Sequence, residues 1–165
     1  TFEASAREVR LPLRMQDGTP RWVWSEPTLA PLSDGSLAML LRFDGRGRLY
    51  RSLSRDGGQS WEEAEPTEIP NPANKPKLLP LRDGRIALLN TPDARTGYAY
   101  RCPLALWVSD DDMRTWKYRR DLVTFPGWLS YPDGICSADG KQILFAFEFN
   151  RHDIYFMRAD IPSAQ

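Results

Sequence analysis

Four side chains carry functional groups that can bind and transform an acidic ligand: Glu26, Arg42, Arg101 and Tyr131. The planar guanidinium of arginine donates two parallel, charge-assisted hydrogen bonds to a carboxylate and stays charged. A phenol beside a carboxylate base can act as a nucleophile or transfer a proton. These residues lie far apart in the sequence, so their convergence depends on a fold that repeats one structural unit.

A short motif occurs twice and defines that unit. Residues 54–61 and 109–116 both read S-x-D-x-x-x-[ST]-W. In a tight turn the aspartate, Asp56 or Asp111, can accept hydrogen bonds from backbone N–H groups ahead of it, while the closing tryptophan covers the turn with apolar surface. We therefore interpret these residues as peripheral and turn-stabilising, with no part in chemistry.

Three stretches predict antiparallel hairpins, because each places an Asp-Gly turn between two apolar strands. The hairpins are residues 27–42, 76–90 and 131–148, and each is followed by a third strand at 49–53, 103–109 or 153–160. After the first two, the repeated turn leads into a fourth strand, near 62–70 and 117–124. No window has the spacing of an amphipathic helix. The predicted fold is all-β: a β-propeller of four-stranded antiparallel blades, with about three blades present.

Residues 1–165 then form a single partial propeller domain. Its blades occupy about 25–70, 75–125 and 129–162, and residues 1–24 supply an outer strand or the remnant of a preceding blade. Three blades make half of a six-bladed ring. We expect a piece of a longer protein, with pairing of two copies as the alternative, because open blade faces favour self-association.

The repeated turns resemble the Asp-box of the BNR-repeat sialidase superfamily, where such turns join the third and fourth strands of propeller blades. Residues 25–29 (SEPTL) and 33–42 (SDGSLAMLLR) are similar to a segment of bacterial BNR-repeat sialidases in which a glutamate begins a blade and an arginine ends its second strand. The resemblance runs from about residue 22 to 162 and implies the C-terminal half of a six-bladed propeller. The family usually has glycine at the position of Met113, so we expect a less regular second turn.

This resemblance implies a sialidase-like glycoside hydrolase, of the exo-α-sialidase or neuraminidase type, acting on an acidic terminal sugar. It makes Tyr131 the nucleophile, Glu26 its base, and Arg42 and Arg101 clamps for the sialic acid carboxylate. Glu148 falls where the family places an acid that orients a further arginine. The chemistry is consistent, because a sugar whose anomeric carbon carries a carboxylate repels a charged nucleophile and suits a neutral phenol.

The family also uses an aspartate general acid and a first arginine from N-terminal blades, and this chain has no match for them. We expect little or no hydrolysis by the isolated chain, so its status as an enzyme stays open. Two alternatives also stay open: another carbohydrate-active propeller, such as a polysaccharide lyase or exo-arabinanase, and a non-catalytic glycan-binding propeller with aromatic residues such as Trp128 stacking on sugars. Hydrogen-bond contact between Glu26 and Tyr131 would favour the sialidase.

Composition argues against nucleic acid, a membrane or a metal ion as a partner. The chain has 22 basic and 22 acidic residues and 41% hydrophobic residues, which is typical of a globular domain and not of a nucleic-acid binder. No apolar run approaches the length that crosses a bilayer, and no signal peptide is visible, so we predict no membrane partner and leave the compartment unknown. One histidine and two widely spaced cysteines predict no metal site, and no cofactor is expected.

Overall fold

The computed structural model describes residues 25–43 and 45–163, which form three antiparallel sheets. The predicted outer strand in residues 1–24 lies outside the described residues. The first sheet contains β1 (Pro27–Pro31), β2 (Leu37–Leu41), β3 (Arg48–Ser54) and β4 (Glu65–Pro70). The second contains β5 (Lys77–Pro80), β6 (Ile86–Asn90), β7 (Leu104–Ser109) and β8 (Tyr118–Val123), with a 3-10 turn, η1 (Tyr98–Tyr100), before β7. The third contains β9 (Leu129–Cys136), β10 (Gln142–Phe149) and β11 (Asp153–Asp160).

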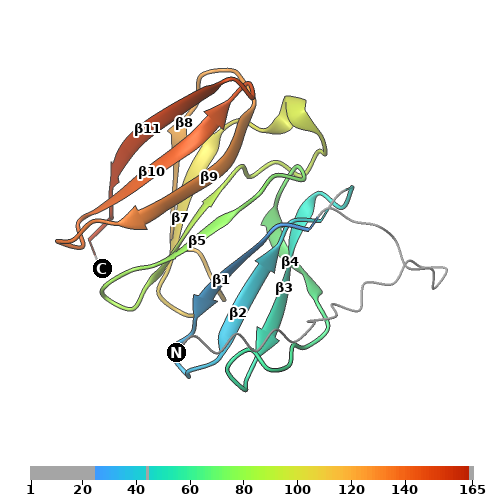
Figure 1. Cartoon of the computed structure of the whole chain (residues 1–165), viewed down its shortest axis with the longest axis vertical. Coiled ribbons are helices and arrows are strands. Elements are labelled where there is room, and N and C mark those ends of the chain that lie inside the picture. Colours follow the sequence, from blue (N-terminus) through green and yellow to red (C-terminus); the bar gives the residue numbers. More distant parts are fainter. Residues whose placement is uncertain (1–24, 44, 164–165) are drawn as a thin grey trace, which may run out of the picture.

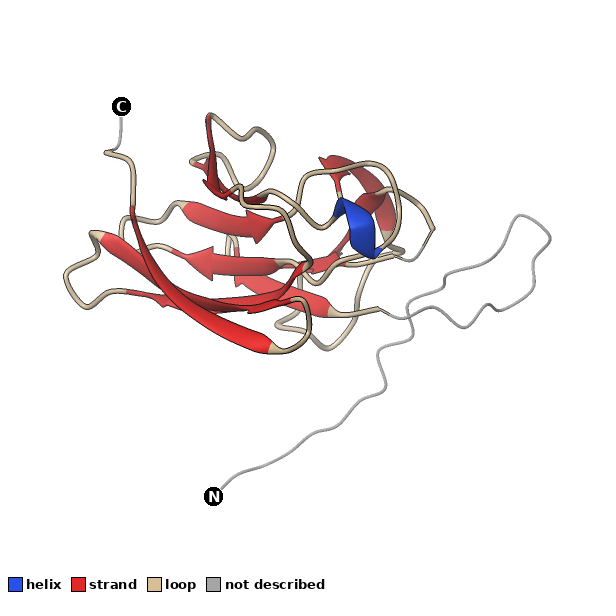
Figure 2. Ribbon diagram, turned by 90° about the horizontal axis from the view of Figure 1, so that it is seen from above, coloured by secondary structure: helices blue, strands red, loops and turns tan. Residues whose placement is uncertain are grey.

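Each sheet is a meander, because strands that follow one another in the sequence are hydrogen-bonded neighbours. Figure 1 shows the three sheets in chain order, with β5 lying between β1 and β9. Figure 2, seen from above, shows the sheets facing one another, as blades of a propeller do. The predicted all-β fold of about three propeller blades is confirmed, and in the described residues the third sheet has three strands where the others have four.

The second sheet is buried on both faces. In β6, Ile86 and Leu88 pack toward the first sheet, while Ala87 and Leu89 pack toward the third. A strand covered on both faces reads as a continuous apolar run, which explains the sequence of β6. Two apolar cores therefore hold the three blades together and fix the strand ends that carry the site.

The two repeated turns have the same hydrogen-bond pattern. Asp56 accepts bonds from the backbone N–H and the hydroxyl of Ser60, at 2.9 and 2.6 Å. Asp111 accepts the equivalent bonds from Thr115, at 2.8 and 2.6 Å. These bonds close each turn before the fourth strand of its sheet, so both aspartates have the turn-stabilising contacts that the motif predicts.

The second turn is as regular as the first, contrary to expectation. Met113 adopts a left-handed φ of 63°, and Gly58, at the equivalent place, has a φ of 93°. Both backbone N–H groups donate to the serine that opens the motif, over 2.9 Å to Ser109 and 2.8 Å to Ser54. Met113 can hold this conformation because its side chain is buried between the first two sheets.

Candidate functional site

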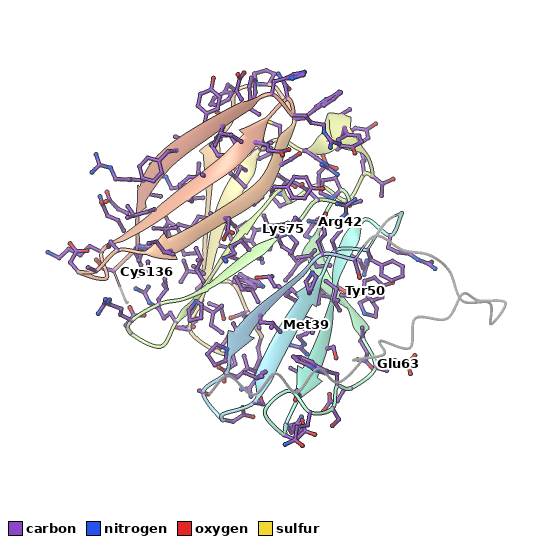
Figure 3. All side chains as sticks on the ribbon, in the orientation of Figure 1. Met39, Arg42, Tyr50, Glu63, Lys75 and Cys136 are labelled. Atoms are coloured by element: carbon purple, nitrogen blue, oxygen red, sulfur yellow. The ribbon has the colours of Figure 1, made fainter. Side chains whose placement is uncertain are left out.

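The open end of the first hairpin carries an ion pair. Glu26 precedes β1 and Arg42 follows β2, and the register that sets Pro27 opposite Leu41 brings the two residues face to face. Arg42 Nη1 donates to Glu26 Oε2 over 2.7 Å. Both side chains are largely shielded from water, which strengthens their attraction relative to an exposed pair. Figure 3 shows Arg42 at the end of the first sheet, in the part of the view that also holds Lys75.

Arg101 lies just after η1 and is buried, with 3% of its surface exposed. Its Nη1 donates to Ser130 Oγ over 2.9 Å and its Nη2 to the Ala73 carbonyl over 2.7 Å. The ring of Tyr98 covers the guanidinium, with 4.2 Å between Cζ and the ring centroid. Arg101 Nε is buried with no hydrogen-bond partner in the described part of the chain. The Nε–H group of Arg101 is therefore a buried donor for which the described residues supply no acceptor.

Charged and phenolic groups from separate segments of the chain act on Arg101. Burial lowers the pKa of its guanidinium, and the like charge of Arg42 lowers it further. Tyr98, Tyr131 and Glu26 oppose this effect and raise the pKa. Because such interactions weaken with distance, the four sequence-predicted residues Glu26, Arg42, Arg101 and Tyr131 share one neighbourhood at the ends of the sheets.

Tyr131 has an unusual backbone. It is half-buried in β9 and has a φ of 52°, in the left-handed region that side chains other than glycine and asparagine rarely adopt. The β9–β10 ladder is irregular beside it, with a register shift between Ala146 and Glu148. Within the described residues, no hydrogen bond joins the Tyr131 hydroxyl to Glu26. The structure therefore brings the two residues into one region without the direct contact that the sequence analysis sought.

Glu148 lies on β10 opposite Ser130, the hydroxyl that binds Arg101. Its Oε2 atom is buried and has no hydrogen-bond partner among the residues that the structure describes. A buried carboxylate oxygen without a donor is costly, so this atom is suited to a cationic group that would approach from outside the described residues. The supporting role predicted for Glu148 stays a prediction.

An asparagine network that the sequence analysis missed lies beneath the site. Asn71 Nδ2 donates to Asn90 Oδ1 over 2.8 Å, and Asn74 Nδ2 donates to the Leu129 carbonyl over 2.7 Å. Asn71 Oδ1 in turn accepts from the Asn74 backbone N–H over 2.8 Å. All three asparagines are buried, so these bonds hold the linker before β5 against the start of β9. Its sequence signal is a pair of asparagines within a proline-rich linker, which alone predicts only a loop.

The described residues contain no group of three or more histidine, cysteine, aspartate and glutamate side chains that could hold a metal ion. His152 is exposed in the turn between β10 and β11. No helix in the described ranges is long and apolar enough to span a membrane.

Comparison with known proteins supports the same fold. A model of the BNR repeat-like domain family matches residues 15–144. No curated protein sequence matches this chain at a significant level. An intramolecular trans-sialidase from leech superposes with a TM-score of 0.65 and 22% identity, over 82% of this chain and 23% of its own. Its counterpart from Ruminococcus gnavus gives 0.63 and 22%, over 90% of this chain and 34% of its own.

The likeness extends beyond sialidases. The α-L-arabinofuranosidase of Fusarium graminearum superposes with a TM-score of 0.52 and 16% identity, over 82% of this chain and 44% of its own. This chain thus spans less than half the length of each of the three proteins. The comparisons show a fold that sialidases share with another glycoside hydrolase.

Proposed function

Because this chain belongs to the BNR repeat-like domain family, we propose that it forms part of a sialidase-like protein that recognises the carboxylate of an acidic terminal sugar. Arg42 and Arg101 bind that carboxylate, Tyr131 is the nucleophile, and Glu26 is its base. The observation that carries the proposal is that two guanidinium groups from separate segments lie close enough for the charge of Arg42 to lower the pKa of Arg101. Two like charges held together in a protected place attract an anion.

The ion pair of Arg42 suggests how binding and chemistry are linked. In the free chain Glu26 is occupied by Arg42 at 2.7 Å. A substrate carboxylate that takes the Arg42 donors releases Glu26 to accept the phenolic proton of Tyr131. The Tyr131 oxygen then attacks the anomeric carbon, the glycosidic bond breaks, and the leaving oxygen takes a proton from a general acid. Glu148 Oε2 accepts a further arginine that orients the sugar.

The test is binding of N-acetylneuraminic acid to the purified chain, compared with its methyl ester, which has the same ring but no charge. Calorimetry or ligand-observed NMR should show at least about tenfold weaker binding of the ester, because one charge-assisted hydrogen bond contributes that much. Arg42→Ala and Arg101→Ala should weaken binding of the acid, whereas Arg120→Ala, on the exposed face of β8, should not. Equal binding of acid and ester would overturn the proposal.

A second candidate is recognition of an acidic glycan without hydrolysis. The absence of a hydrogen bond between Glu26 and Tyr131 in the described residues favours it, because recognition needs only the two arginines. Turnover of a fluorogenic sialoside separates the candidates. Turnover that Tyr131→Phe abolishes supports the hydrolase, and carboxylate-dependent binding with no turnover supports recognition alone.

A further inference from the structure

A cavity lies between the first two sheets, near their outer strands. Its volume is about 670 Å³, within the range of small-molecule sites. We call it the inter-sheet groove and define it by six residues that line it: Arg51, Leu53, Glu65, Met113, Arg114 and Trp116. It involves none of the residues proposed above to bind or transform the acidic sugar, and Figure 3 places Glu63, on its rim, at the outer margin of the molecule and away from Arg42.

The groove exists because the core between the first two sheets is filled by side chains of very different size. Small residues such as Ala38 and Ala105 are buried in this core, and the two sheets lie closest at β1 and β5. Farther out, Met113 and Trp116 of the second turn fill the widening gap, and the cavity lies beyond them. Its floor is therefore apolar and partly aromatic.

Two backbone irregularities border the groove. Met113, on the floor, has a left-handed φ of 63°, which costs about 1–2 kcal/mol for a residue with a side chain. On the opposite wall, the β3–β4 ladder shifts register between Arg48 and Tyr50, which places Thr67 in a bulge. Bulges and strained residues are enriched at functional sites, because they aim side chains that a regular strand would not.

The rim of the groove carries both acidic and basic side chains. Glu62 and Glu68 are engaged by Arg55 and Arg48, at 3.0 and 3.4 Å. Arg119 donates to the Trp116 carbonyl over 3.3 Å and lies over the Trp107 ring. The other four charged side chains of the rim make no ion pair or side-chain hydrogen bond within the described chain, and they are Glu63, Glu65, Arg51 and Arg114. Arg51 and Glu65 are cross-strand partners in the β3–β4 ladder, so a donor and an acceptor lie side by side on the wall formed by the first sheet. Arg114, in the second turn, provides a further donor.

We propose that the inter-sheet groove binds a neutral sugar residue. Each hydroxyl of a sugar both donates and accepts, so neighbouring hydroxyls can be bound by a carboxylate and by a guanidinium together. The C–H face of the ring packs on the apolar floor at Trp116 and Met113. An anionic sugar would meet Glu63 and Glu65, and a cationic sugar would meet Arg51 and Arg114. The site takes a different class of sugar from the acidic one proposed above, and it does not rest on that proposal.

The methionine methyl groups provide a local test. The purified chain is labelled with ¹³C at its methionine methyls and titrated separately with galactose, glucose, N-acetylgalactosamine and N-acetylglucosamine. At least one sugar should shift the Met113 signal in a saturable way at millimolar concentration, while Met39 and Met157, which do not line the groove, stay unchanged. Glucuronic acid and glucosamine, which carry opposite charges, should bind more weakly.

A matched pair of variants shows whether the rim binds the sugar. Glu65→Ala with Arg114→Ala should lower the affinity at least about tenfold, the loss expected from one charge-assisted hydrogen bond. Arg120→Ala with Asp121→Ala, an exposed acid and base on β8 outside the groove, should leave it unchanged. The proposal is overturned if no neutral sugar shifts Met113, if the rim variant binds as well as the original chain, or if a charged sugar binds as tightly as the neutral one.

Discussion

Arg42 and Glu26 are joined by a 2.7 Å ion pair across the open end of the β1–β2 hairpin, although 16 residues separate them in the sequence. The pair orients the Arg42 guanidinium before any ligand arrives and keeps the Glu26 carboxylate occupied. In the function proposed above, the carboxylate of the ligand competes with Glu26 for the same donors. The fixed orientation of Arg42 favours ligand binding, whereas competition from Glu26 opposes it. The strength of the ion pair, which underlies both effects, can be measured.

A double-mutant cycle measures the strength of this pair. Glu26→Gln and Arg42→Lys should each lower the free energy of unfolding by about 1.5–3 kcal/mol, because each leaves a partly buried charge without its best partner. The double variant should lose less than the sum of the two. Urea unfolding is the measurement.

The control cycle is Glu68→Gln with Arg48→Lys. In that pair the Glu68 side chain is 97% exposed and the charges are 3.4 Å apart. Its coupling should be about 0–1 kcal/mol, as is usual at a surface. Equal coupling in the two cycles would show that shielding at the site has no effect.

The repeated turns predict a loss of stability in acid. Hydrogen bonds from the Ser60 hydroxyl and backbone lower the pKa of Asp56 from 3.8 to about 2. Burial acts to raise the pKa of Asp111, but bonds from Thr115 and Ser109 outweigh it and also bring that pKa to about 2. A carboxyl whose pKa is lower in the folded state stabilises the fold above its unfolded pKa. That contribution is lost as the pH falls from 3.8 toward 2.

The double variant Asp56→Asn with Asp111→Asn tests this link. Its deficit in unfolding free energy relative to the original chain should be largest above pH 3.8 and should shrink as the pH approaches 2. Chemical unfolding across a pH series gives both curves. A deficit that does not vary with pH would mean that the two aspartates act through packing alone.

Local patterns accounted for most of the fold. The two S-x-D-x-x-x-[ST]-W turns depend on hydrogen bonds within eight residues. The Asp-Gly hairpins depend on the alternation of apolar and polar residues within each strand. Both features can therefore be predicted from the sequence. The motif also indicated the register of the first two blades. That register placed Glu26 and Arg42 at one end of the first hairpin, where the structure has them.

The environment of the site could not be predicted in the same way. Arg101 is buried because Tyr98, Ser130 and Ala73 come together from three separate segments. The left-handed backbone of Tyr131 likewise appears only once β9 is paired with β10. Such contacts depend on how loops close over long sequence separations, which no local pattern encodes. Sequence reasoning therefore proposed Arg101 as a site residue but did not predict that Tyr98 covers it.

Met113 offers a test of how backbone strain is offset. Met113→Ala should cost about 2–5 kcal/mol, because it empties part of the core between the first two sheets. Met113→Gly removes the same side chain but relieves the left-handed strain, so it should be about 1 kcal/mol more stable than the alanine variant. Gly58→Ala, at the equivalent place with a φ of 93° and no close contact for a Cβ atom, should be destabilising through strain alone. An alanine variant as stable as the glycine variant would show that Met113 is unstrained.

The Tyr98 ring should control access to Arg101. An arginine-selective dicarbonyl reagent, followed by peptide mass spectrometry, should modify exposed Arg114 quickly and Arg101 slowly. Tyr98→Ala should raise the rate at Arg101 several-fold, because it removes the ring that lies 4.2 Å from the guanidinium. Tyr98→Phe should not, since it keeps the ring and loses only the bond from Arg151 to the hydroxyl. Equal rates in the original chain and the alanine variant would place the protection of Arg101 elsewhere.

The outer face of the third sheet should make the chain self-associate. Ile154 and Phe156 of β11 are 70% and 67% exposed, and they share this face with Ile135 of β9, which is 65% exposed. β11 is also the edge strand of its sheet, so in the described chain its outer backbone groups are unpaired. Burying even one such side chain contributes about 1.5–3 kcal/mol, so two copies gain by covering the face.

Sedimentation equilibrium of the original chain should therefore show an oligomer that forms as concentration rises. Ile154→Ser with Phe156→Ser should weaken association at least about tenfold, since it removes more than 1.4 kcal/mol of apolar burial. Arg120→Ser, at an exposed position on β8, is the control and should leave association unchanged. A chain that stays monomeric at every concentration would show that the exposed side chains of β11 are too few to hold two copies together.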